Sequence, residues 1–596
     1  MVKVSDIIAD FLKEKKIDTV FGIIGSANSH IFDSIENLGY TKIICTHHEQ
    51  AAVMAMGAYY RASGKLSATI VTAGAGASNA VTGVVSNWAD SIPGFIISGQ
   101  ESSGYLKSHS NLRMYGTQGF HAYKMVKDIT KYSNVIIDAE TIQNELETLY
   151  NISISDRPGP TWLDIPFDIQ SKQVEKREWK TLNSKSLRLT DAYHYADEII
   201  KLINMSQRPV ILGGMGIKLS GSKNKFQQFI NSTNIPTLLS WSGIDLLPTQ
   251  HRSHFGRFGL YGQRAANFVV QNSDLVIVLG SRLALPQVGY DFSQFARDAK
   301  IIVVDIDENE LYKHDRTVKF NHDCGLILDV LLEKIHKLQT NQINTWVDRC
   351  NEYRKSYPIL SEDYKNDNYV NSYSFVNKLT TNLAENEIIV TDMGTGLLSG
   401  HQACDLKENQ TMFTSQGLGE MGVGLPLAIG AAFAEPTKPI TCLNCDGGIM
   451  MNLQELQTIV QHKLPVKIFV FNNDGYLMIK HTQKMLFKGK YNAVNKATGI
   501  VLPDFKKVAF GFDLPYLNIT KLEDLDTIQY PKGPCLIEVF MDPEQDFIPK
   551  VKGVAVASDD SIFAPPIEEM SPLLSFEAIK REMVIPISEK SKQIKR

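Results

Sequence analysis

Two polar clusters follow two apolar segments in the last third of the chain. The turn Asp446-Gly447-Gly448 follows the apolar run 439–444, and the pair Asn472-Asn473 follows the run 465–471. Between the clusters, apolar residues recur at helical spacing over 451–462, so the segment reads as strand, helix and strand. The strands of such a βαβ unit are parallel. Both clusters are therefore expected at the carboxyl edge of one sheet, where ligands bind in open α/β folds.

The residue types in these clusters suit a metal bridged to phosphate. One carboxylate, one amide oxygen and free loop carbonyls are oxygen ligands of low total charge, which Mg²⁺ takes when it also binds a diphosphate. The N–H groups of Gly447 and Gly448, where a helix is predicted to begin, would add an anion site. The plainer interpretation is that Asp446 caps this helix and the asparagines form a turn. The two clusters together, with Asn473 placed 27 residues after Asp446, favour the metal site.

The pattern resembles the cofactor motif of thiamine diphosphate-dependent enzymes, which begins Gly-Asp-Gly and ends Asn-Asn. This resemblance implies that Asp446, Asn473 and the carbonyl of Gly475 hold Mg²⁺ on the diphosphate of the cofactor. The chain departs from the motif at its first position, where Cys445 stands in place of glycine. Because the metal ligand of the motif is Asp446, the departure concerns local backbone geometry more than metal binding.

The resemblance extends over nearly the whole chain, and the family members it suggests are acetolactate synthase large subunits and related carboligases. The further matching segments are 18-DTVFGIIGSAN-28, 72-TAGAGASNAVTGV-84, 116-GTQGF-120, 391-TDMGTG-396 and 415-SQGLGEMGVGLPLAIGAA-432. The resemblance implies that Gly394 and Thr395 approach the diphosphate, that Met421 lies under the bend of the cofactor beside Gly419, and that Met478 flanks the thiazolium. Methionine at an apolar position is more often core filling, so these two assignments depend on the motifs.

A thiamine enzyme also needs a carboxylic acid that hydrogen-bonds the pyrimidine N1′ of the cofactor. An apolar strand ends at Thr46, and Glu49 stands at the start of the helix that follows. Glutamate is common in a first helical turn because the helix dipole favours it there. The family carries a glutamate at this step, so the resemblance assigns the acid to Glu49. We expect an apolar pocket to raise its pKa.

Three histidines, His47, His48 and His121, are candidates for the substrate cavity. His121 follows the loop 116–120, where synthases carry a glutamine that reaches the active site, and we assign it as catalytic. For each of the three, a solvated or core histidine is an equally good interpretation.

The residue at position 479 indicates which reaction to expect. Decarboxylases that release aldehyde carry a glutamate in a Gly-Tyr-x-x-Glu arrangement, and here Ile479 stands at that place. An apolar pocket without this proton donor favours transfer over release. We expect a two-carbon acyl-anion unit to pass from pyruvate, or a similar 2-oxoacid, to a carbonyl acceptor.

The acceptor stays open at this stage. A second pyruvate would give acetolactate, but His121 and Gly396 replace the glutamine and histidine of synthases. A keto sugar of surface-polysaccharide biosynthesis and a sulfoacetaldehyde acetyltransferase-like reaction are the alternatives.

The alternation of β-branched runs and helical patterns predicts an α/β fold with three doubly wound parallel-sheet domains. At 596 residues the chain is too long for one core. We place a pyrimidine-binding domain at 1–180, a central Rossmann-like domain at 190–345 and a diphosphate-binding domain at 365–550. Residues 551–596 form a C-terminal tail, in which 563–574 is expected to pack across the surface.

Composition excludes several classes of partner and location. A net charge of −4 gives no basic excess for nucleic acid or an anionic membrane. No signal peptide and no membrane span is predicted. The seven scattered cysteines indicate free thiols in a reducing cytoplasm. The family resemblance implies a homodimer or homotetramer, in which the pyrimidine-binding block of one chain meets the diphosphate-binding block of another.

Two other classes of function use similar folds. An NAD- or FAD-dependent oxidoreductase needs a Gly-x-Gly-x-x-Gly turn, and 213-GGMGIKLSG-221 lacks that spacing. The strand ends at 211–216 and 303–307 are compatible with a structural FAD, a cofactor that some family members bind. A non-catalytic thiamine-binding relative is the third possibility, and the presence of Glu49 argues against it.

Overall fold

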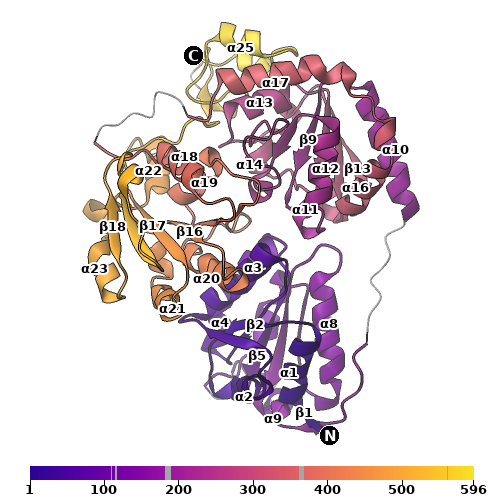
Figure 1. Ribbon diagram of the computed structural model, residues 1–596, viewed down its shortest axis with the longest axis vertical. Coiled ribbons are helices and arrows are strands. Elements are labelled where there is room, and N and C mark those ends of the chain that lie inside the picture. Colours follow the sequence, from indigo (N-terminus) through magenta and orange to yellow (C-terminus); the bar gives the residue numbers. More distant parts are fainter. Residues whose placement is uncertain (109–110, 115–116, 181–188, 361–367, 560) are drawn as a thin grey trace. The chain divides into compact units, whose positions relative to one another are not determined.

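The computed structural model describes residues 1–108, 111–114, 117–180, 189–360, 368–559 and 561–596. Gly116 and residue 365, at which two of the predicted segments begin, lie outside these ranges. Three parallel β-sheets with flanking helices make up the fold (Figure 1), which confirms the predicted α/β class and its three parallel-sheet domains. Two compact units can be separated: residues 1–184, 386–397 and 411–543 form one, and 185–385, 398–410 and 544–596 form the other.

The N-terminal sheet has six parallel strands in the order β3-β2-β4-β5-β7-β6. Its strands are β2 (Thr19–Gly22), β3 (Lys42–Cys45), β4 (Ala68–Val71), β5 (Gly94–Gln100), β6 (Tyr132–Val135) and β7 (Pro160–Pro166). Its helices are α1 (Val4–Glu14), α2 (Ser29–Leu38), α3 (Glu49–Ser63), α4 (Ala75–Asn79), α5 (Val81–Ala89), α6 (Ser103–Ser108), α7 (Ala122–Met125), α8 (Ile142–Ile154) and α9 (Phe167–Gln170), with β1 (Val2–Lys3) paired to β8 (Gln173–Val174). Strands β2, β4, β5 and β7 are buried along their whole length, as strands covered on both faces should be.

The C-terminal sheet repeats this topology, with its six parallel strands in the order β15-β14-β16-β17-β19-β18. Its strands are β14 (Ile388–Thr391), β15 (Thr411–Phe413), β16 (Ile440–Cys445), β17 (Val466–Asn472), β18 (Tyr516–Ile519) and β19 (Cys535–Phe540). The helices that accompany them are α19 (Thr395–Ala403), α20 (Gly424–Ala434), α21 (Glu455–Gln461), α22 (Leu477–Leu486), α23 (Phe505–Gly511) and α24 (Asp524–Thr527). In both sheets the strand order reverses between the first and third strands in sequence, which creates a switch point at the carboxyl edge.

One prediction about local structure is wrong. A continuous helix was expected over 451–462, but a short 3₁₀ helix at Ile449–Met451 comes first and α21 begins only at Glu455. The side chain of Asn452 donates a hydrogen bond to the carbonyl of Gly422, 2.8 Å away, so residue 452 leaves helical geometry to meet a neighbouring loop. The turn after β16 therefore does not open directly into an α-helix.

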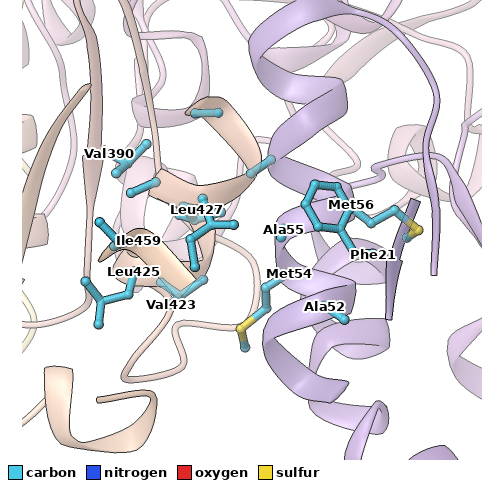
Figure 2. Packing of buried hydrophobic residues seen from close by; sticks show 14 of the residues in the cluster. Phe21, Ala52, Met54, Ala55, Met56, Val390, Val423, Leu425, Leu427 and Ile459 are labelled. Atoms are coloured by element: carbon cyan, nitrogen blue, oxygen red, sulfur yellow. The ribbon is translucent and has the colours of Figure 1, made fainter. Parts of the chain in front are cut away.

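Helices α3 and α20 pack against each other between the N-terminal and C-terminal sheets of the first unit. Figure 2 shows Ala55 of α3 and Leu427 of α20 on the facing sides of the two helices, within one buried apolar cluster. Gly430 permits this close approach, since a Cβ at that position would lie 2.1 Å from the carbonyl oxygen of Ala55. The N-terminal block (residues 1–184) and the C-terminal block (386–397 and 411–543) of this unit therefore share a tightly packed core.

The second unit is built on a five-stranded parallel sheet in the order β10-β9-β11-β12-β13. Its strands are β9 (Pro209–Gly213), β10 (Thr237–Leu239), β11 (Leu275–Leu279), β12 (Lys300–Asp305) and β13 (Thr317–Asn321). Its helices are α10 (Leu189–Met205), α11 (Met215–Leu219), α12 (Lys223–Thr233), α13 (Arg264–Gln271), α14 (Leu285–Val288), α15 (Glu308–Tyr312), α16 (Cys324–Glu333), α17 (Asn344–Ser356) and α18 (Ser372–Asn382).

The C-terminal tail is part of the core of the second unit. It contains β20 (Val554–Ala555), β21 (Ile562–Phe563), α25 (Phe576–Glu582) and α26 (Glu589–Lys592). Ile567 and Met570 are buried in the same cluster as Phe268 of α13. Glu568, also buried, pairs with Arg297 at 2.8 Å. The segment expected to cross the surface is thus an internal element of this unit.

All seven cysteines are free, as the sequence predicted. In the part of the chain that the structure covers, no helix has both the length and the apolar character needed to cross a membrane.

Candidate active site

Asp446 lies at the carboxyl edge of the C-terminal sheet, where it directly follows β16. Its side chain is 1% exposed. Oδ1 accepts the N–H of Gly447 at 2.7 Å, and Oδ2 accepts the N–H groups of Asn473 at 2.9 Å and Gly475 at 3.1 Å. Burial raises the pKa of Asp446 to about 6, although these backbone donors oppose the shift. The structure thus joins the two polar clusters through one carboxylate.

Asn473 connects this carboxylate to the loop that follows β14. Its Oδ1 accepts a hydrogen bond from the Thr395 hydroxyl at 2.9 Å, and its Nδ2 donates to the carbonyl of Gly475 at 2.6 Å. Gly475 has φ +111, and a Cβ there would lie 2.1 Å from the Val494 carbonyl oxygen, so glycine is required. Thr395, Asn473, Gly475 and Asp446 therefore form one hydrogen-bonded group from three loops.

The chemistry of this group fits Mg²⁺ bridged to a diphosphate. The oxygen atoms of Asp446, Asn473 and Gly475 are hard ligands that carry a single negative charge, and each has lone-pair capacity beyond its hydrogen bonds. Within the described residues, no cluster of three or more His, Cys, Asp or Glu side chains suited to a metal exists. Because Asp446, Asn473 and Gly475 offer three protein oxygens, a metal at this edge would take phosphate oxygens to complete its coordination.

Gly447 and Gly448 are only partly as expected. The N–H of Gly447 already donates to Asp446, and a Cβ at this residue would meet the Tyr476 ring at 2.3 Å. Gly448 is the N-cap of the 3₁₀ helix Ile449–Met451, so a short 3₁₀ helix, and not the predicted α-helix, begins at this turn. Close packing accounts for both glycines.

Cys445 has a clear structural role, although its departure from the motif was unexplained by the sequence. It is the last residue of β16, and its backbone needs no left-handed conformation. The thiol accepts the N–H of Gly396 at 3.1 Å and donates to the carbonyl of Met393 at 2.9 Å. Gly394 has φ +92 and turns beside the sulfur. The side chain of Cys445 therefore braces the loop predicted to approach the diphosphate.

Asp392 is a buried acid that the sequence reasoning missed. Its Oδ1 accepts the N–H groups of Gly422 at 2.8 Å and Val423 at 3.1 Å, while its Oδ2, fully buried, has no hydrogen-bond partner among the described residues. Oδ2 lies against Gly448, where a Cβ would be 2.0 Å away. Burial raises the pKa of Asp392 to about 7. The quoted segment 391-TDMGTG-396 contained the signal, an acid directly after a buried strand at the switch point.

The loop that carries Gly419 and Met421 is held from two sides. Asp392 binds the N–H groups at its end, and Asn452 donates to the carbonyl of Gly422. Gly419 has φ +76, and Met421 is half-buried. The structure therefore holds this loop in a fixed shape beside the Asp446 turn.

Glu49 begins α3 at the carboxyl edge of the N-terminal sheet. It is 8% exposed, and its Oε2 accepts a hydrogen bond from Asn79 Nδ2 at 3.0 Å. Gly76 lies beside Oε1, since a Cβ at that glycine would be 3.1 Å away. The expected apolar pocket is thus partly polar where Asn79 reaches the carboxylate.

The loop that leads to His121 packs on the turn that follows β4. Gln118, three residues before His121, packs on Gly74, two residues before the Gly76 that Glu49 touches. Phe120 is anchored through its carbonyl, which accepts Gln100 Nε2 at 2.9 Å. The half-buried His121 ring makes an edge contact with Tyr123. Glu49 and the His121 loop therefore flank one turn of the N-terminal sheet.

The buried acid Asp164 binds the chain just after His121. It accepts hydrogen bonds from Trp162 Nε1, the N–H of Tyr123 and Gln100 Nε2, and burial raises its pKa to about 6. Like Asp392, it was not predicted as a functional group.

Met478 and Ile479 lie on α22. Met478 is half-buried, and Ile479 is 47% exposed on the outer face of the helix. Within a single chain, Ile479 does not lie in the enclosed apolar pocket that the sequence suggested.

In the central sheet, the glycines that suggested a nucleotide have a packing role. A Cβ at Gly214 would lie 2.2 Å from the Gly280 carbonyl oxygen, and one at Gly216 would lie 2.6 Å from the Gly280 Cα. The turns after β9 and β11 thus touch backbone to backbone.

These features, an oxygen cluster at the switch point of one parallel sheet and an acid at the edge of another, are those of an α/β enzyme that binds a phosphate-bearing cofactor. Residues 2–125, 196–331 and 392–539 match the models of the thiamine pyrophosphate enzyme N-terminal TPP binding domain, central domain and C-terminal TPP binding domain. The chain belongs to the thiamine pyrophosphate enzyme family.

Its curated relatives include acetolactate synthase large subunits. The chain is 30% identical over 555 residues to isozyme 1 of Escherichia coli, covering 92% of this chain and 95% of that protein. It is 28% identical over 571 residues to the protein of Lactococcus lactis, with 94% and 96% covered. It is 29% identical to a probable large subunit of Methanocaldococcus jannaschii over 561 residues, with 91% and 93% covered. The chain is thus an enzyme of the acetolactate synthase-like transferase/lyase kind.

Proposed function

We propose that the protein transfers a two-carbon unit from pyruvate, or a similar 2-oxoacid, to a carbonyl acceptor, with thiamine diphosphate and Mg²⁺ as cofactors. The observation that carries this proposal is the joining of Asp446, Asn473, Gly475 and Thr395 into one oxygen-lined group at the switch point. The names of the relatives, acetolactate synthases, support the same reaction class.

Each proposed residue has a distinct task. Asp446, Asn473 and the Gly475 carbonyl would hold the metal, and Gly394 and Thr395 would approach the diphosphate. Met421 and Gly419 would contact the pyrimidine side of the cofactor, and Met478 its thiazolium. When bound, thiamine diphosphate supplies the carbon centre that adds to the 2-oxoacid. Glu49 would hold a proton at N1′ of the pyrimidine, and His121 would face the substrate.

Ligation is favoured over aldehyde release by Ile479, because no proton donor occupies its place on α22. A second pyruvate is the acceptor that the relatives' names suggest. Acetyl transfer to a keto sugar and a sulfoacetaldehyde acetyltransferase-like reaction are the alternatives.

The experiment is incubation of the purified protein with thiamine diphosphate, Mg²⁺ and pyruvate, alone and with each acceptor, followed by mass measurement of the products. A product heavier than the acceptor by C2H4O, which is an acetyl group on carbon and a hydrogen on the former carbonyl oxygen, supports the proposal and identifies the acceptor. Mostly free acetaldehyde, with no carbon–carbon product, would contradict it. Unchanged turnover in Glu49→Gln would contradict the assignment of the acid.

We propose that the working form is a homodimer or homotetramer whose site combines Glu49 of one chain with Asp446 of another. Side-chain contacts of Glu49 stay within the N-terminal block and those of Asp446 within the C-terminal block. Large apolar side chains are exposed on or beside the site loops and α22, as expected of a surface that another chain covers. They are Leu418, Met450, Met451, Ile479, Met485, Leu486 and Phe487.

Two further assignments belong to the proposal. We place the enzyme in the cytoplasm, where free thiols persist. A structural FAD in the central domain has the weaker support, because packing already accounts for Gly214 and Gly216. The absorption spectrum of the pure protein tests it directly.

A further inference from the structure

Glu455 is a buried acid to which the proposed chemistry gives no task. It is the first residue of α21 in the C-terminal block and is 0% exposed. Burial raises its pKa, and hydrogen bonds from Thr458 and the His47 backbone oppose the shift. A carboxylate removed from water is costly unless its oxygens are satisfied, so its partners indicate why it is there.

One oxygen of Glu455 binds His47 in the turn before α3 directly, and the other reaches it through Thr458. Oε1 accepts the backbone N–H of His47 at 2.9 Å. Oε2 accepts the Thr458 hydroxyl at 2.7 Å, and that hydroxyl oxygen lies 3.0 Å from His47 Nδ1. A hydroxyl has a single hydrogen, which here goes to Glu455, so Nδ1 of His47 must be the donor to Thr458. Glu455 therefore binds the backbone of His47 directly and the ring of His47 through Thr458.

The turn at residues 46–48, which Glu455 holds through His47, determines where α3 begins. The Thr46 hydroxyl donates to the carbonyl of His48 at 3.0 Å, which closes the turn. His48 is the N-cap, and its Nδ1 accepts the N–H of Gln50 at 3.1 Å. Glu49 is the first helical residue, two positions after His47. The direction of the Glu49 carboxylate is thus set by a turn that the C-terminal block holds.

The frame around this turn is rigid. Helix α3 packs on α20 with the close approach at Gly430 and Ala55, and Asn79 holds the Glu49 carboxylate from the other side. Sliding of α3 would disturb this close packing, so we do not expect displacement of His47 to shift the whole helix. Such displacement would instead alter the turn and the first residue of the helix.

We propose that Glu455 is a positioning residue for Glu49: by holding the His47 turn, it orients the acid that the proposed function assigns to the cofactor pyrimidine. This inference rests on the proposed function, because it gives Glu455 a task only if Glu49 acts there. It gives no catalytic role to Glu455 itself.

The first test needs no cofactor. In Glu455→Ala, the backbone N–H of His47 loses its acceptor, so its hydrogen exchange should become at least about tenfold faster in the cofactor-free protein. Glu455→Gln keeps an oxygen that can accept this N–H and should lie between the alanine variant and the wild type. Gln457→Ala, at an exposed position of the same helix, is the matched control and should exchange as the wild type. Unchanged protection of His47 in both Glu455 variants overturns the inference.

The second test follows the task of Glu49. With thiamine diphosphate and Mg²⁺ bound, exchange of the C2 hydrogen of the cofactor for deuterium should slow about tenfold in Glu455→Ala, with the Kd of the cofactor within about twofold of wild type. In the Glu49→Gln background, Glu455→Ala should cause no additional slowing, because both changes act through one group. Additive losses, or a loss of cofactor affinity that accounts for the slower exchange, overturn the inference. Should the alanine variant fail to fold, Glu455→Gln carries the same comparison.

The two proposals fail in different ways. If the single variant Glu49→Gln shows the wild-type rate of C2 hydrogen exchange, the assignment of Glu49 as the acid is wrong. If Glu49→Gln is slow while both Glu455 variants exchange at the wild-type rate, only the positioning role is wrong.

Discussion

The thiol of Cys445 accepts a hydrogen bond from the backbone N–H of Gly396, at 3.1 Å, and so ties the end of β16 to the loop after β14. These two strands flank the switch point of the C-terminal sheet. The residue that departs from the cofactor motif thus stabilises the loop that carries Gly394 and Thr395.

Replacement of this thiol should weaken cofactor binding. Cys445→Ala removes both sulfur contacts, each worth at most about 1 kcal/mol, and we expect a two- to tenfold rise in the Kd of thiamine diphosphate, measured by fluorescence titration with Mg²⁺ present. Cys445→Ser keeps a donor and an acceptor and should recover part of the affinity. Cys535→Ala, a buried thiol within β19, is the control. Wild-type affinity in Cys445→Ala would contradict the bracing role.

The Thr395 hydroxyl should affect the metal more than the cofactor body. It donates to Asn473 Oδ1 and so fixes the amide oxygen proposed as a Mg²⁺ ligand. Thr395→Val removes this donor with little change of volume, and we expect the Mg²⁺ concentration at half-maximal cofactor binding to rise about three- to tenfold. Asp446→Ala should abolish metal-dependent binding altogether, and chelation of Mg²⁺ should do the same in the wild type. Equal Mg²⁺ requirements in Thr395→Val and wild type would rule out the predicted effect.

Two inactive variants should restore activity when they share a dimer. Glu49→Gln and Asp446→Ala remove groups that we assign to the same site but to different chains. When the two variants are co-expressed in equal amounts, random pairing leaves one intact site in each mixed dimer, or about one quarter of wild-type activity. Each variant purified alone is the control. No recovery in isolated mixed dimers would mean that one chain supplies both groups.

The stability of the protein should depend on Asp164 in a defined pH window. The pKa of this buried acid is about 6 in the folded protein, raised by desolvation from an ordinary 3.8. The folded state therefore holds the proton more tightly, so the stabilisation is full below the lower pKa and is lost as pH rises through about 6.

Asp164→Asn cannot titrate, and its curve of unfolding free energy against pH should lack this fall. We expect the difference between wild type and variant to change by about 1–3 kcal/mol between pH 4 and 7, measured by urea unfolding. A difference that is independent of pH would show that Asp164 does not titrate there.

Much of the fold followed from local pattern, because parallel strands buried on both faces read as short apolar runs and the helices between them as amphipathic segments. The meeting of Asp446 and Asn473 followed from one βαβ unit, since consecutive parallel strands end at the same edge. Glu49 was placed at the first residue of its helix. These inferences use neighbours in sequence.

What sequence reasoning missed depends on contacts between distant segments. Asp392 matters because it meets Gly422 and Gly448, and Glu455 because it meets His47, 408 residues earlier. The predicted helix at 451–462 failed for the same reason, since Asn452 turns to a loop that periodicity does not reveal. The exposure of Ile479 likewise depends on surroundings that no local pattern describes.

The burial of the tail in the second unit has a consequence for synthesis on the ribosome. Ile567, Met570 and Met583 complete a buried apolar cluster that also contains Phe268 and Tyr353. When those earlier residues emerge, the segment that covers them has not been made, and at about 5–20 residues per second roughly 10–40 s pass before it is available. During that interval the nascent central sheet carries an open apolar face, so this core cannot be completed before Met583 has been made. A chaperone that shields apolar surface should therefore bind the nascent chain at the central sheet before Ile567, Met570 and Met583 emerge.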